Sequence, residues 1–407
     1  MSILSGKNIL VGISAGIAAY KSAHLVRGFI KAGANVKVVM TPASKDFITS
    51  LTLSTLSKNP VLSSFVNEKD GGKNDNPMWN NHVELGLWAD YFVIAPATAN
   101  TLSKMATGEC DNLLLATYLS AKCQVFVAPA MDLDMYKHPS VITALEKLAS
   151  YNNIIIPATL GELASGLVGE GRMAEPEDIV TFLETYVLKQ LPLYGKKVLI
   201  TAGPTYEAID PVRFIGNHSS GKMGFEIAKA AANLGAEVML ITGPSAETVN
   251  HSSIKRIDVV SAEQMYDAVH QYFNTTDIAI LSAAVADYKP KIYASQKIKK
   301  QVATLSLELE KTKDILKSLG AIKTHQFLVG FALETENELE NSKLKLKSKN
   351  LNLIVLNSLN DDGAGFGVST NKVTFITENN ETIQFNKKPK AEVAIDLLQQ
   401  VLKQLHA

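Results

Sequence analysis

Short apolar runs alternate with helical patterns along the first half of the chain. The first run, residues 8–13 (NILVGI), is almost uninterrupted and stops at small residues, which is typical of a buried parallel strand. Apolar positions then recur at helical spacing over residues 17–32, and Gly33 predicts the end of that helix. Further strands are expected at residues 36–40, 91–95, 124–128 and 153–157, with residues 98–120 largely helical. The pattern predicts a doubly wound α/β domain.

The same order of elements begins again near residue 196. KKVLITAG predicts a strand and a loop, followed by a helix over residues 223–234 and a strand at 237–242. Later strands are expected at 277–282, 326–330 and 353–356, then a hairpin over 372–385 that turns at Asn379-Asn380, and a helix from about Pro389. The stretch LPLYG at 191–195 suits a linker. We therefore predict two Rossmann-like α/β domains, residues 1–190 and 191–407, each with three layers and a mainly parallel sheet, the second extended by a β-hairpin.

Composition narrows the class of protein. The 407 residues include 40 Lys and Arg and 40 Asp and Glu without a long block of one sign, so we expect neither nucleic acid nor a membrane as a partner. Cys110 and Cys123 lack the spacing of a zinc site or a disulfide framework, which fits a reducing compartment. We see no signal-peptide pattern and no apolar run of about 18 residues, and expect a cytoplasmic protein.

The first glycine-rich loop runs from Gly12 to Gly16 (GISAG) and has several interpretations. It matches the nucleophile elbow G-x-S-x-G, but no upstream segment could supply a hydrolase's second oxyanion donor. It falls short of the dinucleotide motif G-x-G-x-x-G, and the second strand ends in Met40-Thr41 without an acidic residue for a ribose. A loop that binds one phosphate, such as that of FMN, through backbone N–H groups and the Ser14 hydroxyl is favoured, and a tight turn without a ligand stays open.

The second glycine-rich segment, GNHSSGKM at 216–223, resembles a P-loop in all but its last position. A Walker loop needs Ser or Thr after the lysine to hold magnesium, and Met223 cannot coordinate that ion. Asn217, Ser219 and Ser220 still place neutral donors at a helix start. We expect a phosphate-binding loop of another type, with a plain helix cap as the alternative.

Longer motifs carry a resemblance over nearly the whole chain. GISAGIAAYK, HVELGLWAD, APATANT, CDNLLLATYL, APAMDLDMY and GEGRMAEP resemble the FMN-dependent cysteine decarboxylases. ITAGPT, DPVRFIGNHSSGKMG, SAAVADY, KIKK, VGFALET and the lysine-rich run before LNLIVLN resemble the phosphopantothenate-cysteine ligases. In this order they resemble the bifunctional coenzyme A biosynthesis proteins, which fuse a phosphopantothenoylcysteine decarboxylase to a phosphopantothenate-cysteine ligase.

The resemblance of the first half implies an FMN-dependent decarboxylase. Loss of CO₂ from a cysteine carboxylate leaves an electron pair that needs a sink, and the flavin provides one in this family. His82 matches the catalytic base, a role that suits an imidazole near neutral pH, although a histidine at a helix start needs no such role. Short polar residues after a strand, such as Thr98 and Asn100, can also merely cap a helix. The implied flavin contacts are Gly12, Ser14, Ala15, Gly16, Thr41, Thr98 and Asn100, and the implied substrate contacts are Met131, Arg172 and Met173.

The resemblance of the second half implies a ligase that activates 4'-phosphopantothenate as an acyl-cytidylate with CTP and Mg²⁺ before cysteine attacks. Asn217 would stabilise that intermediate and Arg213 would bind near the substrate, while the metal ligands stay unassigned. A lysine run such as that at 343–349 is also typical of a solvated helix face. The implied nucleotide contacts are Ala283, Asp287, Lys297, Lys313, Asp314, Ile315, Leu316, Phe331, Lys345 and Lys349.

Two positions depart from the decarboxylase pattern. The family's loop P-A-M-N reads Pro-Ala-Met-Asp here, and an ionised Asp132 cannot donate the hydrogen bond that an amide gives to a substrate carboxylate. The flap before GRM, which commonly carries a proton-donating Cys, has Ser165, a far weaker acid. These departures leave three functions open: a bifunctional enzyme, an active ligase fused to an impaired or altered decarboxylase, and a non-catalytic flavoprotein partner. Both component families assemble as homo-oligomers, which implies the same for this chain.

Overall fold

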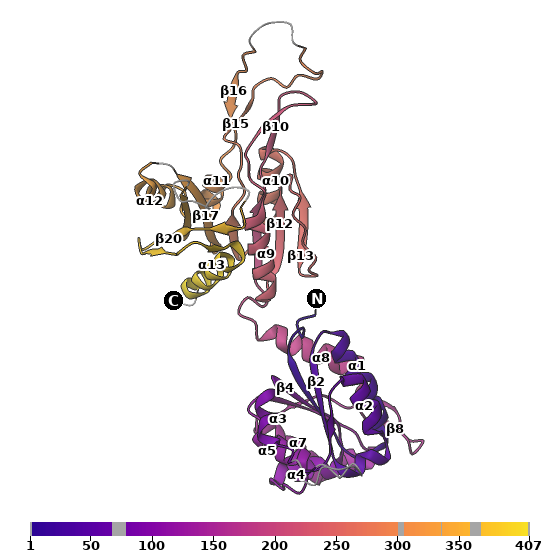
Figure 1. The fold of residues 1–407 in the computed structure, drawn as a ribbon. Coiled ribbons are helices and arrows are strands. Elements are labelled where there is room, and N and C mark those ends of the chain that lie inside the picture. The colour runs from indigo at the N-terminus through magenta and orange to yellow at the C-terminus, as the bar shows by residue number, and fades with distance from the viewer. Residues whose placement is uncertain (1, 67–78, 300–304, 335, 359–367, 406–407) are drawn as a thin grey trace, which may run out of the picture. The chain divides into compact units, whose positions relative to one another are not determined.

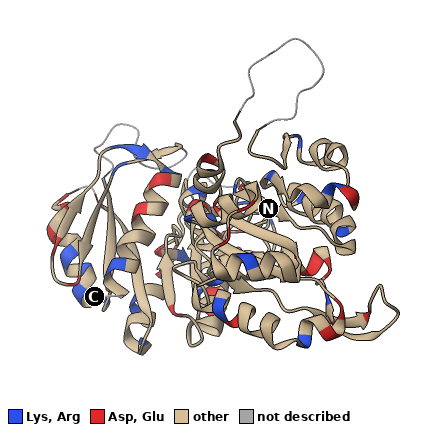
Figure 2. Cartoon of the chain, turned by 90° about the horizontal axis from the view of Figure 1, so that it is seen from below, with Lys and Arg blue, Asp and Glu red and all other residues tan. Residues whose placement is uncertain are grey.

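The computed structural model describes residues 2–66, 79–299, 305–334, 336–358 and 368–405. The chain forms two compact units, Met1–Leu188 and Lys189–Ala407 (Figure 1). None of the helices described is both long enough and apolar enough to cross a membrane. Acidic and basic residues are interspersed along the ribbon of both units (Figure 2).

The first unit is a parallel sheet with the strand order β3-β2-β1-β4-β5-β6, which is that of a Rossmann fold. One face packs on α1 and α8, and the opposite face packs on α4, α5 and α7. Figure 1 shows α1 and α2 on one side of this sheet and α3 and α5 on the other. The strands are β1 (Asn8–Ile13), β2 (Asn35–Met40), β3 (Val61–Leu62), β4 (Tyr91–Ala97), β5 (Gln124–Pro129) and β6 (Ile154–Ile155). The helices are α1 (Ser22–Lys31), α2 (Ser50–Ser57), α3 (His82–Trp88), α4 (Ala99–Thr107), α5 (Leu113–Ser120), α6 (Leu133–Lys137), α7 (Pro139–Ser150) and α8 (Pro176–Lys189), with 3₁₀ turns η1 (Ile17–Lys21) and η2 (Pro42–Asp46).

Several expected elements of the first unit differ in detail. The helix expected over 17–32 begins as the 3₁₀ turn η1, and α1 starts only at Ser22. The helical stretch 98–120 is two helices, because Gly108 takes a φ of 81° and ends α4. An antiparallel hairpin, β7 (Thr159–Glu162) and β8 (Val168–Arg172), was not expected. Alternate glycines in β8 leave it without an apolar pattern that periodicity could detect.

The second unit repeats the Rossmann order in the parallel strands β13-β12-β9-β14-β17-β18 and adds the antiparallel strands β20 and β21. The predicted fold class, two doubly wound domains with a hairpin on the second, is therefore confirmed. Helices α9 and α13 cover one face, and α10, α11 and α12 the other. The strands are β9 (Lys197–Ala202), β12 (Glu237–Thr242), β13 (Ile254–Asp258), β14 (Ile278–Leu281), β17 (Phe327–Glu334), β18 (Leu353–Ser358), β20 (Val373–Thr377) and β21 (Thr382–Gln384). The helices are α9 (Lys222–Asn233), α10 (Ala262–Phe273), α11 (Ile315–Ile322), α12 (Glu338–Ser348) and α13 (Lys390–Leu405).

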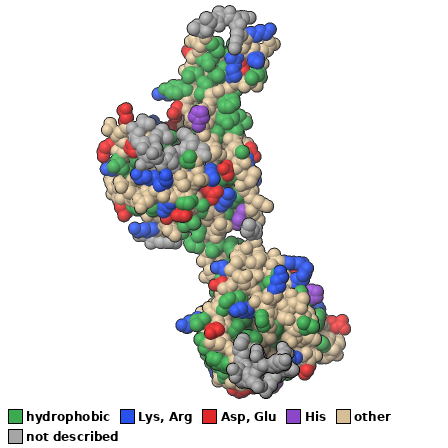
Figure 3. All heavy atoms as spheres, viewed as in Figure 1, with side chains coloured by type: hydrophobic (Ala, Val, Ile, Leu, Met, Phe, Trp, Pro, Cys, Tyr) green, Lys and Arg blue, Asp and Glu red, His purple; other side chains and the backbone are tan. Residues whose placement is uncertain are grey.

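Short two-stranded ladders lie outside the main sheet of the second unit. One pairs β10 (Tyr206–Ala208) with β11 (Phe214–Gly216), and another pairs β15 (Tyr288–Pro290) with β16 (Leu309–Lys311). A third pairs β19 (Thr370–Asn371) with β22 (Lys388–Pro389). The first two form an extension that shows apolar side chains at the surface (Figure 3). The exposed members include Val212, Phe214, Tyr288, Ile292, Tyr293, Leu305 and Leu309.

Candidate functional site

A cavity of ≈ 730 Å³ opens in the first unit at the carboxyl ends of its strands. The loops after β1, β4 and β5 line it, and the hairpin β7–β8 contributes a further wall. Strands β1 and β4 are the point where the winding of the sheet reverses, and open α/β sheets bind ligands in the crevice there. The sheet order therefore creates this site.

Ser14 ties two loops of this cavity together. Its hydroxyl donates to the carbonyl of Pro96 at 2.8 Å and accepts from the Thr98 N–H at 2.9 Å, while its own N–H donates to Pro96. The Ser14 side chain is fully buried and positions the loop after β4. The sequence suggested that its hydroxyl would face a ligand, but Ser14 is not among the residues that line the cavity. Ala15 and Gly16 line the cavity instead.

The loop after β1 fits a ligand that approaches the backbone closely. A Cβ added to Gly16 would come within 3.0 Å of Thr98 Cγ2, so a side chain there would fill the space between the two loops. Thr98 and Asn100 line the same cavity, and Thr98 makes no side-chain cap to α4. The interpretation of Thr98 as a mere helix cap is therefore not supported.

Four other predicted residues of the first unit lie outside this cavity lining. Gly12 is inside β1, where a Cβ would meet Phe92 at 3.0 Å, and Ser165 is exposed at the tip of the β7–β8 hairpin. Thr41 directly follows β2, and its buried Oγ1 has no hydrogen-bond partner among the described residues. His82 is the first residue of α3, and its Nδ1 is also buried without a hydrogen-bond partner among the described residues. The His82 ring packs edge-on against Trp79 and Phe65. Buried polar atoms without partners are uncommon, which marks Thr41 and His82 as open to a ligand.

Charged side chains gather at the far end of the cavity. Met131, Asp132, Arg172 and Met173, to which the sequence analysis drew attention, line it, and so does Lys21, which the sequence analysis did not single out. The buried ammonium of Lys21 donates to Glu175 at 2.9 Å and to the Met173 carbonyl at 3.3 Å. The hydrogen bond from Lys21 is the main cause that holds the pKa of Glu175 below its usual value. The burial of Lys21 was not predictable, because a single Lys within a predicted helix is normally expected at the surface.

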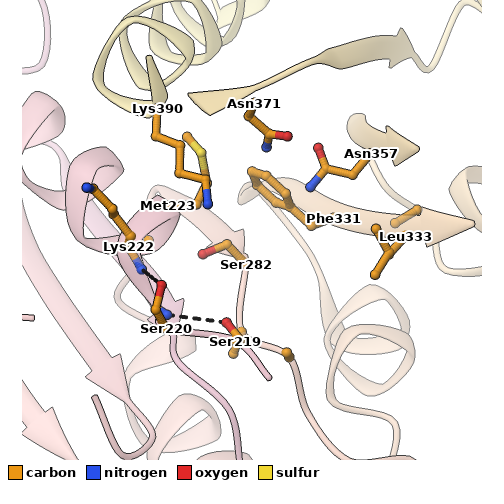
Figure 4. A pocket seen from close by; sticks show the side chains of 15 residues that line it. Ser219, Ser220, Lys222, Met223, Ser282, Phe331, Leu333, Asn357, Asn371 and Lys390 are labelled. Carbon is orange, nitrogen blue, oxygen red and sulfur yellow. Dashed lines mark hydrogen bonds between the residues drawn. The ribbon is translucent and has the colours of Figure 1, made fainter. Parts of the chain in front are cut away.

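The second unit has a smaller cavity, ≈ 120 Å³, at the equivalent reversal between β9 and β14. The start of α9, the loop after β14 and residues of strands β17 and β18 line it. Among the predicted nucleotide contacts, Ala283 and Phe331 lie here. Figure 4 shows further polar residues around this cavity. Ser219, Ser220 and Lys222 belong to the glycine-rich segment expected to bind phosphate, whereas the sequence analysis did not single out Ser282, Asn357, Asn371 and Lys390.

Lys390 gives this cavity a positive wall. It begins α13, is 6% exposed, and reaches toward Met223 opposite Asn371 and Asn357 (Figure 4). Burial lowers the pKa of Lys390, and the charge of Lys222 lowers it further. The Oδ1 of Asn357 is buried and has no hydrogen-bond partner among the described residues. Two ammonium groups beside a helix start favour an anionic ligand such as a phosphate.

Asn217 and Arg213 lie on the chain that leads into α9. The Asn217 amide donates to the Ala284 carbonyl at 2.9 Å, which links its loop to that after β14. The Arg213 guanidinium donates to the Asp210 carboxylate at 2.9 Å and to the Ile298 carbonyl at 2.9 Å. The hydrogen bond from Arg213 is the main cause that holds the pKa of Asp210 well below its usual range. In this structure, Arg213 therefore joins segments of its own chain.

The remaining predicted nucleotide residues do not line this cavity. Asp314 caps α11 and pairs with Lys349 at 2.9 Å, so these two predicted residues do lie together. Lys345 pairs with Glu334, and Lys313 with Glu263 at 3.4 Å. Asp287 and Lys297 are exposed, and Ile315 and Leu316 begin α11. No group of three or more His, Cys, Asp or Glu within the described ranges could hold a metal ion.

Both units match known protein families. Residues 2–188 match the family model "Flavoprotein", and residues 193–405 match the "DNA/pantothenate metabolism flavoprotein C-terminal domain". The coenzyme A biosynthesis bifunctional protein of Bacillus subtilis is 43% identical over 401 residues, 98% of this chain and 97% of that protein. The corresponding protein of Vibrio cholerae is 42% identical over 97% of this chain and 98% of that protein. The chain belongs to the family of bifunctional coenzyme A biosynthesis proteins.

A further relative has a different name. A "cysteine/cysteine sulfinic acid decarboxylase" from an unknown prokaryotic organism is 52% identical over 364 residues, 88% of this chain and all of that protein. The chain is therefore also similar to a protein that is named after free amino acids.

Proposed function

We propose that the chain catalyses two consecutive steps of coenzyme A biosynthesis. Residues 191–407 join 4'-phosphopantothenate to cysteine with CTP, and residues 1–190 decarboxylate the product, phosphopantothenoylcysteine, to 4'-phosphopantetheine. The observation that carries the proposal is a separate cavity at the sheet reversal of each unit, one within the part that matches flavoproteins and one within the part that matches their C-terminal domain.

The first unit has the groups that an FMN-dependent decarboxylation requires. Bound FMN supplies the electron sink for the bond that breaks between Cα and the carboxyl carbon. Backbone at Ala15 and Gly16, with Thr98 and Asn100, binds the cofactor, and Thr41 offers an unpaired hydroxyl at the adjacent strand end. Because η1 is a 3₁₀ turn of five residues, backbone contact rather than the dipole of a long helix is the main support for this assignment.

Proton transfer in the first unit is assigned to His82, and substrate positioning to the charged end of the cavity. The unpartnered Nδ1 of His82 is available to take a proton. Met131, Arg172 and Met173 border the substrate, with Arg172 held in place by Glu175 at 2.7 Å. Ser165, at the tip of the flap hairpin, takes the position of a stronger acid and is assigned as the proton donor.

The second unit has to neutralise phosphate charge while a carboxylate is activated. Ser219 and Ser220 precede α9, a helix of 12 residues whose first N–H groups can bind an oxyanion, and Lys222 and Lys390 add positive charge. Asn217 stabilises the acyl-cytidylate, and Ala283 and Phe331 border the nucleotide. Mg²⁺ accompanies CTP as it does in other nucleotide-dependent ligations, without assigned protein ligands.

A second candidate function is decarboxylation of free cysteine by the first unit. The observation that favours it is the 52% identity to the relative named as a cysteine/cysteine sulfinic acid decarboxylase, which this chain covers completely. In that case the ligase unit would retain its own reaction.

The extension of the second unit favours a homo-oligomer. Its exposed apolar side chains, among them Phe214, Ile292 and Tyr293, would be buried by a second copy. Light scattering of the purified protein should give at least twice the 44.0 kDa of one chain. A mass of one chain at micromolar concentration would contradict this assignment.

The test of the proposed function follows all intermediates by mass spectrometry. Purified protein that contains FMN receives Mg²⁺, 4'-phosphopantothenate, cysteine and either CTP or ATP. We expect 4'-phosphopantetheine, CO₂ and pyrophosphate, with CTP preferred. Accumulation of phosphopantothenoylcysteine without CO₂ would indicate a ligase with an impaired decarboxylase. No turnover at all would indicate a non-catalytic flavoprotein partner.

A further inference from the structure

The cavity of the first unit contains a carboxylate without a partner. Asp132 follows β5 and lines the cavity. It occupies the N-cap position of α6, yet its side chain makes no cap hydrogen bond, and none of the described residues forms an ion pair with it. A partly buried carboxylate is costly unless a cation or a donor approaches it. Asp132 is therefore available to pair with a cationic group of a ligand.

Side chains of the opposite charge line the same cavity. Lys21 and Arg172 both donate to one oxygen of Glu175, Oε1, at 2.9 and 2.7 Å. Two cations share one carboxylate, so the three side chains together carry a net positive charge. Glu162 also borders the cavity, but it is exposed on β7. The cavity lining thus offers one negative and one positive position.

The backbone holds together the two segments that carry Asp132 and Arg172. The Met131 N–H donates to the Gly171 carbonyl at 2.9 Å, so Asp132 and Arg172 each follow directly on a hydrogen-bonded residue. The Gly171 backbone is so close to this loop that an added Cβ would lie 2.5 Å from the Met131 carbonyl oxygen. A rigid contact of this kind keeps the spacing of the two charges constant.

An α-amino acid with a free amine matches this arrangement. Its ammonium group can pair with Asp132 while its carboxylate pairs with Arg172. An N-acylated amino acid keeps the carboxylate but has a neutral amide in place of the ammonium, so Asp132 stays unpaired near a like charge. The charges of the cavity thus discriminate between acylated and free amines.

Building on the decarboxylase function proposed for the first unit, we propose that Asp132 is a specificity-determining residue that admits free cysteine as a substrate. The bond between Cα and the carboxyl carbon breaks, CO₂ leaves, and a proton from solvent takes its place, which gives cysteamine without net oxidation. The ligase unit consumes the same amino acid, so the two units draw on one pool of cysteine.

The test compares substrates and variants of the full chain loaded with FMN. Cysteamine and CO₂ are measured with free L-cysteine, and CO₂ with N-acetyl-L-cysteine and with phosphopantothenoylcysteine. We expect Asp132→Asn to lower kcat/KM for free cysteine about tenfold or more, mainly through KM, because a charged pair becomes a neutral contact. For the two acylated substrates the same variant should keep or raise kcat/KM.

A binding measurement separates this role from a structural one. Calorimetric titration with S-methyl-L-cysteine, and with its N-acetyl derivative, uses ligands with and without the ammonium group. Asp132→Asn should weaken binding of the first ligand alone. Asp134→Asn is the matched control, because Asp134 is an exposed residue of the same helix outside the cavity lining.

Three outcomes are decisive. Selective loss of free cysteine in Asp132→Asn, with wild-type flavin content, supports the proposal. CO₂ from phosphopantothenoylcysteine but none from free cysteine in the wild type overturns it and leaves the proposed function intact. Absence of CO₂ from every substrate overturns the decarboxylase function itself.

Discussion

The hydroxyl of Ser14 and the ammonium of Lys21 both lie in surroundings that differ from those that the sequence suggests. Ser14 looks like a phosphate donor, yet it is fully buried and bonded to Pro96 and Thr98. Lys21 looks like a residue on a helix surface, yet it is 6% exposed and borders the cavity. In both cases the loops that fold over the residue decide its function, and those loops are far away in the sequence.

His82→Ala is expected to stop CO₂ release and to leave the ligase reaction unchanged. Removing a general base typically lowers a rate by about 10²–10⁴-fold. The measurement is CO₂ release from phosphopantothenoylcysteine, with pyrophosphate release from CTP in parallel. His24→Ala, at an exposed position of α1, is the control. Full decarboxylation by His82→Ala at wild-type flavin content would rule out His82 as the base.

The Asp210 carboxylate should make the stability of the second unit depend on acidity. Its pKa is depressed, chiefly by Arg213, so it stabilises the fold above the ordinary value of about 3.9 and ceases to do so as the pH falls toward the folded-state pKa. We expect the melting temperature of Asp210→Asn to lie below that of the wild type by a constant amount from about pH 7 to 5. The gap should narrow below about pH 4.

Scanning calorimetry over this pH range measures the effect of Asp210. Asp267→Asn, at an exposed position of α10, serves as the control and should track the wild type throughout. A gap that widens on acidification would have the wrong sign for a depressed pKa.

Among the elements, α9 depends on a glycine within its first turn. A Cβ at Gly224 would lie 2.5 Å from Ala202 Cβ and 2.8 Å from Ser282 Oγ, so the helix packs on β9 at a distance that only glycine allows. Gly→Ala inside a helix normally stabilises by about 1 kcal/mol. Here we expect a loss of about 1–3 kcal/mol from overpacking.

The free energy of unfolding of the second unit, measured from its unfolding transition in urea, tests the role of Gly224. Asn233→Ala, at the exposed C-terminal end of the same helix, is the control for a general change in helix propensity. A Gly224→Ala variant as stable as the wild type would show that the helix can move away from β9.

Periodicity identified most central elements, but it did not identify the short ladders. Strands such as β1 and β12 have continuous apolar runs, and the turn at Asn380 has the positive φ, 62°, that an Asn tolerates. The β7–β8 hairpin and the β15–β16 ladder instead have mixed or polar sequences. Their pairing depends on neighbouring segments, so no local pattern reveals them.

At the scale of the whole molecule, the two units should act as separate catalysts linked by a diffusible intermediate. His82→Ala cannot decarboxylate and Asn217→Asp cannot stabilise the acyl-cytidylate, if the proposed roles hold. We expect either variant alone to form no 4'-phosphopantetheine from 4'-phosphopantothenate, CTP and cysteine. A mixture of the two should restore product to within about a factor of two of the wild type at equal total concentration, because each variant keeps one intact unit.

Mass spectrometry of the time course distinguishes the possible results of mixing. The intermediate should appear first and then decline as the second variant consumes it. A mixture that accumulates the intermediate without product would indicate that substrate passes only within one assembly. Each variant's intact reaction, measured alone, shows that its other unit is folded.

The sequence by itself determined that the chain contains two doubly wound units, and its motifs indicated one flavin-type and one nucleotide-type chemistry. The two units could be identified because burial of one face makes apolar residues recur at a regular spacing along each strand and helix. The tertiary structure alone decided which polar groups meet. Asp132, Lys21 and Arg172 come from three separate segments, and Lys390 joins Lys222 from the last helix. Sheet order brings such residues together, and it depends on long-range packing that no local window of sequence contains.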